Sequence, residues 1–101
     1  MKYNIRFERM YNMTYDEFIE YLYVEGEARI KIDDFRLCIL NQDSQHNTWP
    51  TEFLLIQEDE NYNDLKEAYV AKNKFENYIL YNKMTLKELF NLNNFEIIEL
   101  F

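Results

Sequence analysis

The sequence predicts an α+β protein: one small domain over residues 1–101, with a mainly antiparallel sheet of four to six strands and two or three short helices. The spacing of apolar residues switches repeatedly between two and about 3.6, the periods of strands and helices. Two segments carry the Thr-x-x-Glu pattern that begins helices. The 101 residues are 48% apolar and 18% aromatic, which is enough material for a single core.

The N-terminal elements follow from alternation and then from capping chemistry. Apolar residues alternate with polar ones over residues 3–7 and predict a half-buried strand. Thr14 and Glu17 form a capping box, in which the hydroxyl and the carboxylate each accept a backbone N–H, and apolar residues follow at helical spacing. The predicted helix ends near Gly26, one of the strongest helix-ending signals.

The middle of the chain predicts three strands. Residues 28–32 and 35–39 alternate in the same way and predict a hairpin, although the intervening Asp-Asp is a weaker turn signal than Asn-Gly. A polar connection over residues 41–50 leads to a short apolar strand over residues 53–56.

An acidic loop over residues 58–64 follows, and Asn63 is a plausible N-cap for a second helix. Leu65, Ala68 and Tyr69 recur at helical spacing and are expected on its inner face. The sequence therefore predicts that the acidic loop joins a strand to a helix.

The C-terminal third contains one ambiguous segment and two clear ones. Residues 78–81 favour a strand by composition, but a continuation of the preceding helix would bury the same apolar side chains. Thr85 and Glu88 form the second capping box and predict a short helix, and residues 95–101 predict a final strand.

Residues 13–19 and 84–90 share Met, Thr and Glu in register. Two interpretations remain open: a duplicated β-α-β unit, or two independent helix starts that use the same capping chemistry. The second is favoured because a capping box is short and common.

The charges are unevenly distributed, and this is the main functional signal. The net charge is −8, and residues 10–28 and 37–65 contain no Lys or Arg. Such blocks favour a protein that presents carboxylates to a basic partner over one that grips phosphates. The candidate partner-binding residues are Asp16, Glu17, Glu20, Glu25, Glu27, Glu58, Asp59, Glu60, Tyr62 and Asp64.

No catalytic motif is present in the sequence. Cys38 lies in an alternating strand and is expected to be a packed thiol. Asp43, Ser44 and His46 contain the letters of a triad but lie too close together in one loop to adopt its geometry, and His46 is expected to be an exposed loop histidine. With one glycine there is no phosphate-cradling loop. We therefore expect neither an enzyme nor a bound cofactor.

The acidic loop partly matches a calcium-binding EF-hand. Asp59, Asn61 and Asn63 occupy its first, third and fifth positions, but Asp64 stands where Gly is needed and Val70 where a bidentate Glu is needed. No dedicated metal site is expected, and adventitious divalent binding is the alternative.

The sequence also predicts the cellular location of the protein. It has no apolar run of the roughly 18 residues that span a membrane, and its start lacks the apolar core of a signal peptide. A single cysteine agrees with a reducing compartment. The expected location is the cytoplasm, which is the host cytoplasm if the protein is phage-encoded.

Two functional hypotheses result. In size, charge and composition the chain is similar to small acidic phage proteins that inhibit restriction or CRISPR nucleases or repair enzymes. This similarity implies a non-catalytic DNA mimic that occupies a basic site on a nucleic-acid-binding enzyme and contacts no nucleic acid or membrane itself. The alternative is a small α+β interaction or assembly module whose acidic blocks are solvated faces, and which is either monomeric or homodimeric.

Overall fold

The computed structural model describes residues 13–24, 26–43 and 50–101. The strand predicted over residues 3–7, the candidate residue Glu25, Ser44 and His46 lie outside the described residues. In chain order the elements are α2 (Tyr15–Val24), β1 (Ala28–Ile32), β2 (Phe35–Asp43), β3 (Pro50–Glu58), β4 (Asp64–Ala71), α3 (Lys72–Phe75), α4 (Leu86–Phe90) and β5 (Phe95–Leu100).

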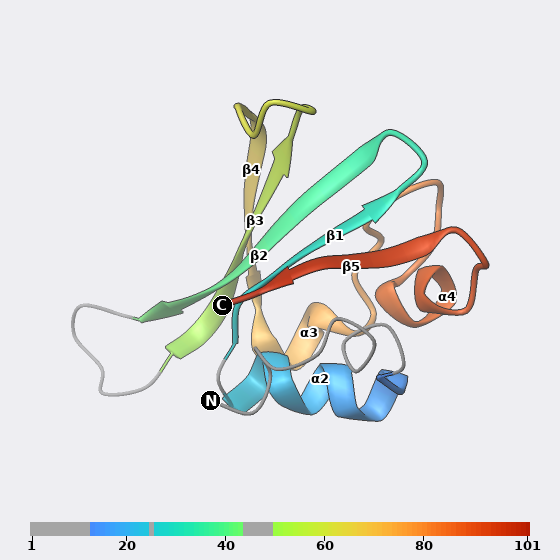
Figure 1. Ribbon diagram of the computed structural model, residues 1–101. Helices are drawn as coiled ribbons and strands as arrows, with labels where there is room; N and C mark the ends of the chain where they lie inside the picture. The colour runs from blue at the N-terminus through green and yellow to red at the C-terminus, as the bar shows by residue number, and fades with distance from the viewer. Residues whose placement is uncertain (1–12, 25, 44–49) are drawn as a thin grey trace.

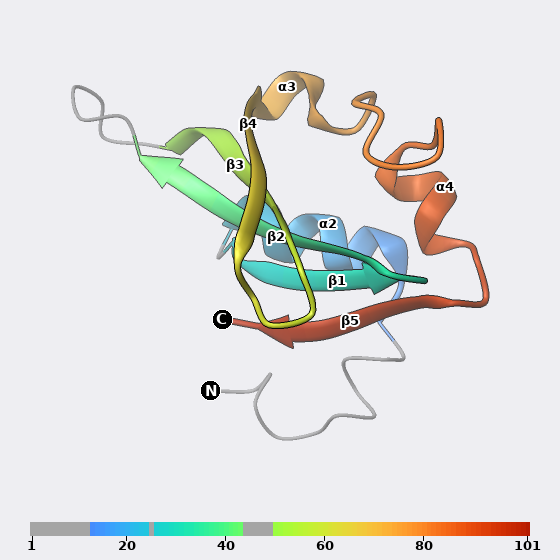
Figure 2. The ribbon, with the colours of Figure 1, turned by 90° about the horizontal axis from the view of Figure 1, so that it is seen from above.

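The described strands form one antiparallel sheet in the order β4-β3-β2-β1-β5, so that β4 and β5 are its edges (Figure 1). The α2, α3 and α4 helices lie on one side of the sheet (Figure 2). This confirms the predicted α+β class, with five strands and three helices among the described residues.

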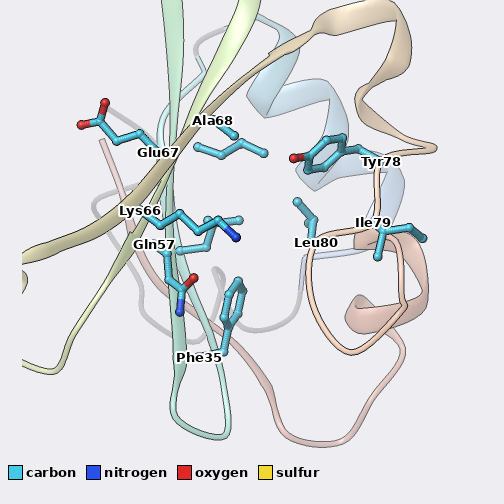
Figure 3. A pocket seen from close by; sticks show the side chains of 10 residues that line it. Phe35, Gln57, Lys66, Glu67, Ala68, Tyr78, Ile79 and Leu80 are labelled. Carbon is cyan, nitrogen blue, oxygen red and sulfur yellow. The ribbon is translucent and has the colours of Figure 1, made fainter.

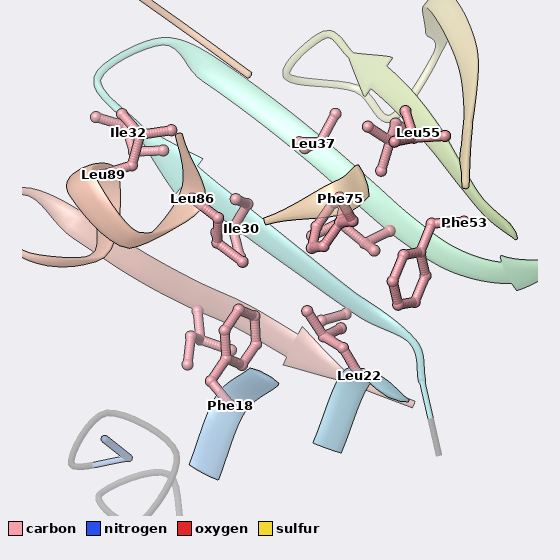
Figure 4. Close-up of a cluster of buried hydrophobic side chains, with 14 of the residues drawn as sticks. Phe18, Leu22, Ile30, Ile32, Leu37, Phe53, Leu55, Phe75, Leu86 and Leu89 are labelled. Atoms are coloured by element: carbon pink, nitrogen blue, oxygen red, sulfur yellow. The ribbon is translucent and has the colours of Figure 1, made fainter. Parts of the chain in front are cut away.

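The core lies between the helices and the sheet because the strands turn alternate side chains toward the helices. Phe18 and Leu22 of α2, Phe75 of α3 and Leu86 of α4 are fully buried against the sheet (Figure 4). From the strands come Ala28, Ile30, Ile32, Phe35, Leu37, Ile39, Phe53, Leu55, Val70 and Ile97.

Both predicted capping boxes are formed. The Thr14 N–H donates to Glu17 Oε1 at 2.8 Å, and the Glu17 N–H donates to Thr14 Oγ1 at 3.1 Å. Thr85 and Glu88 make the same reciprocal pair at the start of α4. Each box satisfies backbone N–H groups that the first helical turn leaves unpaired.

Gly26 ends α2 as predicted, and its glycine identity is required. Its φ is +75°, and its N–H donates to the carbonyl of Tyr21 at 2.8 Å. A Cβ at this position would lie 1.0 Å from Nδ2 of Asn41, which itself donates to the carbonyl of Leu22. Asn41 belongs to β2, so the strands extend into the segment that the sequence predicted as a connection.

The helix predicted from Asn63 is wrong. Residues 64–71 instead form β4, which pairs antiparallel with β3. Leu65 and Tyr69, which were expected on an inner helix face, are exposed on the outer face of the sheet, whereas Ala68 and Val70 face the helices. Pairing with β3 outweighs the weak helical spacing because strand formation depends on such non-local partners.

The segment over residues 78–81 is neither the strand nor the helix that its composition allowed. It is a loop that ends in an isolated bridge between Tyr81 and Met84. Asn82 and Lys83 have φ values of +52° and +63°, which form the tight turn between the bridged residues. Tyr78, Ile79 and Leu80 of this loop line a groove beside β4.

Candidate functional site

Among the strand residues whose burial the structure describes, the most exposed belong to a hairpin arm, residues 58–71, which we call the β3–β4 arm. Its turn is held by Asp59, whose carboxylate accepts the N–H groups of Asn61 at 2.8 Å and Asn63 at 2.9 Å. The side-chain amide of Asn63 donates to the same carboxylate at 3.2 Å. These hydrogen bonds lower the pKa of Asp59, and the Asp59 carboxylate therefore serves to shape the turn.

The arm is fastened across the sheet by Arg29 of β1. Its guanidinium group donates to Glu58 at 2.9 Å and to Glu99 of β5 at 2.7 Å. It also lies 4.9 Å from the ring centroid of Tyr62 and 5.1 Å from that of Phe101. The hydrogen bond to Glu58 is the main reason that the pKa of Arg29 is raised. Arg29 thus joins the base of the arm to the opposite edge of the sheet.

Glu58 is consequently a buried partner of Arg29, with 4% of its surface exposed. A carboxylate in this position is satisfied within the fold and has little surface to offer another protein. Among the candidate residues of the arm, Glu60 and Asp64 are exposed carboxylates that make no hydrogen bond or ion pair within the described residues.

Beyond these carboxylates, the arm exposes large apolar surface. Tyr62, Leu65 and Tyr69 are 49%, 59% and 58% exposed. Glu67 of β4 is also exposed and points to the same face as Leu65 and Tyr69. The helical spacing that placed Leu65 and Tyr69 on an inner helix face hid them as surface residues; the alternation of Ala68 and Val70 is the signal that could have found them.

The second acidic block is the α2 helix. Asp16 and Glu20 are exposed, Glu17 is engaged in the capping box, and Glu27 is half-buried beside the start of β1. The backbone carbonyl of Glu27 accepts the N–H of Phe101 at 2.9 Å. Of this block, Asp16 and Glu20 are therefore the described carboxylates best placed for contact with a partner.

The two blocks do not share a surface. The α2 helix lies at one end of the view in Figure 1 and the β3–β4 turn at the other, with the sheet between them. Figure 2 looks down on the turn with α2 behind the sheet. One partner groove therefore cannot contact both blocks through a single face of this domain.

Two tyrosines of α2 hold the fold together through their hydroxyl groups. The hydroxyl of Tyr23 donates to the carbonyl of Lys72 at 2.8 Å, and that of Tyr15 donates to Glu76 at 3.0 Å. Burial is the main cause of the raised pKa values of both phenols. Among the described residues, the exposed tyrosines are Tyr62 and Tyr69 of the arm and Tyr78, which is 37% exposed.

Cys38 is a packed thiol, as predicted, with 4% of its surface exposed. Burial, followed by the nearby Glu58 carboxylate, raises its pKa to about 11. A nucleophilic thiol needs the opposite shift, toward the thiolate. Within the described residues, no cluster of three or more His, Cys, Asp or Glu side chains has the arrangement of a metal site.

Comparisons of the chain with known protein families, with curated proteins and with solved structures gave no significant match. None of the helices in the described part of the chain has the length and apolar character needed to cross a membrane.

Proposed function

We propose that this protein is a non-catalytic binding module whose β3–β4 arm engages a basic surface of a partner protein. The observation that carries the proposal is the composition of the arm: Tyr62, Leu65 and Tyr69 are about half exposed and lie among the exposed carboxylates of Glu60, Asp64 and Glu67. Aromatic and apolar area beside carboxylates is what an Arg- and Lys-rich surface can bind through cation–π contacts and ion pairs.

Nucleic-acid-binding enzymes are the partner class we put first, because the sites in which they bind phosphates are basic. A DNA mimic that uses both acidic blocks is not the form we propose, since α2 and the β3–β4 turn lie at opposite ends of the molecule in Figure 1. The proposed contact is confined to the arm. The alternative, a solvated acidic face that serves only solubility, makes the opposite prediction for the experiment below.

The test compares two charge-reversal variants that have the same net charge. One carries Glu60→Lys and Asp64→Lys on the arm, and the other carries Asp16→Lys and Glu20→Lys on α2. All four residues are exposed, so both variants are expected to fold. Each tagged protein, with the unmodified one, is used to capture partners from a lysate of the cells that encode it, at low and at high salt.

The expected result is a partner that the unmodified protein and the α2 variant retain at low salt, that high salt releases, and that the arm variant loses. Loss of roughly a hundredfold in affinity corresponds to about 3 kcal/mol. Equal loss in both variants would indicate a general charge effect and would contradict an arm-specific site. If both variants retained the partner, the carboxylates of the arm would not take part in binding and would serve only to keep the protein soluble.

A further inference from the structure

A groove runs beside β4 on the side of the sheet that carries the helices. One wall is β4, the other is the loop around Tyr78, and the floor comes from β2 and β3 (Figure 3). It contains about 430 Å³ of space that opens to solvent. The lining residues are Phe35, Leu37, Leu55, Gln57, Lys66, Glu67, Ala68, Tyr78, Ile79 and Leu80.

The groove has an apolar floor with a few polar groups above it. Phe35, Leu37 and Leu55 are buried core residues whose outer surfaces form the floor. Figure 3 shows the Lys66 ammonium group and the Tyr78 hydroxyl directed toward the open space. Such a combination accepts apolar side chains and orients the backbone that carries them.

β4 forms the rim of this groove and is an edge strand, with β3 as its one neighbour among the described strands. Every second residue of an edge strand directs its N–H and C=O groups away from the sheet, and these groups can pair with an added strand. Five of the eight β4 residues are exposed. The side chain of Glu67 points away from the groove in Figure 3, so an added strand would meet Glu67 on one face and the groove on the other.

Charge disfavours self-pairing of two β4 strands in the registers centred on Lys66 and Glu67. Opposite residues of an antiparallel pair point to the same face. A two-fold axis perpendicular to the sheet therefore lies between the strands and places one residue directly opposite its own copy. An axis at Glu67 would oppose two carboxylates, and an axis at Lys66 would oppose two ammonium groups, both of which are destabilising. An axis at Ala68 brings Glu67 opposite Tyr69 and gains no complementary charge pair. An axis at Leu65 brings Asp64 opposite Lys66, so a second copy of the chain in that register is the competing occupant that the test below separates from a basic segment.

We propose that the β4 edge and its groove bind an extended, basic segment of the partner protein as an additional strand of the sheet. This inference rests on the proposed function, because it names how the arm holds its partner. Apolar side chains of the segment enter the groove. The alternate side chains, Lys or Arg, lie on the outer face beside Glu67 and near the carboxylates of Glu60 and Asp64, and this charge complementarity is the reason for a basic occupant.

The probe is a synthetic peptide of alternating Lys and Val, of the eight-residue length of β4 and blocked at both ends. Two control peptides separate the requirements: one has the same composition with the Lys and Val residues in separate blocks, and one alternates Glu and Val. Binding is measured by fluorescence anisotropy, and hydrogen exchange locates the protected amides.

Two variants test the site itself. Ala68→Phe fills the groove from its β4 wall, and Glu67→Lys reverses the charge on the outer face without touching the core. Glu67 is exposed, so its variant keeps the test valid if Ala68→Phe misfolds. Glu96→Lys, which reverses an exposed charge on the opposite edge strand β5, is the matched control.

The alternating basic peptide is expected to bind saturably and to protect β4 amides, and Glu67→Lys is expected to weaken it about tenfold while Glu96→Lys leaves it unchanged. Equal binding of the block peptide, or no binding, would overturn strand addition. The proposed function would still be decided by the arm and α2 variants, which do not depend on this peptide. A concentration-dependent dimer that Ala68→Phe disrupts would overturn the proposal in favour of a second copy of the chain.

Discussion

Replacing Phe75 with alanine is expected to lower the free energy of unfolding by about 3–5 kcal/mol, a large part of the 5–15 kcal/mol typical of a small domain. The Phe75 side chain is fully buried in the core, with 0% of its surface exposed to solvent. It is the one buried residue of the four-residue helix α3. Its ring centroid lies 4.6 Å from that of Phe53 on β3. The substitution leaves a cavity where the sheet, α3 and the following loop meet.

Chemical denaturation of the Phe75→Ala variant provides the measurement, with Ile79→Ala as its control. Ile79 lies four residues further along the same segment but is 53% exposed, so its truncation is expected to change stability by less than about 0.5 kcal/mol. If both variants lost the same amount, Phe75 would not be the residue that holds this segment to the core.

Replacing Arg29 with methionine is expected to cost about 3 kcal/mol, because it leaves the buried carboxylate of Glu58 without its cation. The Glu58 side chain is 5% exposed and that of Arg29 is 24% exposed, so solvent replaces only part of the lost interaction. The arm would also lose its attachment to β5, since Arg29 is the residue that contacts both Glu58 and Glu99.

Two further variants show whether this cost comes from the unpaired charge. Arg36→Met removes a cation that lies 5.9 Å from the Tyr62 ring but has no ion pair within the described residues, and it is expected to cost less than about 1 kcal/mol. Changing Glu58 to leucine in the Arg29→Met background is expected to recover most of the loss. Equal stability of the two single variants would show that the Arg29 pairs contribute little.

The parts of the fold that could be predicted are those determined by residues close in sequence. Thr14 and Glu17, and Thr85 and Glu88, form their capping boxes within one helical turn, so the pattern alone located both helices. The hairpin at Asp33 followed from strict alternation on both sides of a short turn.

β4 could not be predicted because its conformation depends on β3. Leu65, Ala68 and Tyr69 have helical spacing, and only pairing with residues that precede the turn makes the segment a strand. The same limit applies to the charges: Glu58 counted as a surface acid because the sequence does not show that Arg29, 29 positions earlier, reaches it across the sheet. The distribution of charges in the sequence therefore identified an acidic segment, but it did not show which of its carboxylates are paired within the fold.

The most direct test of the arm as the binding surface is hydrogen exchange of the protein alone and in complex with its captured partner. The proposal predicts protection concentrated in the β3–β4 turn and β4, extending to the loop over residues 78–80, with the exchange of α2 and β5 unchanged. Protection of α2 or β5 with an unchanged arm would contradict it and would move the binding surface to the helical side or to the opposite edge of the sheet.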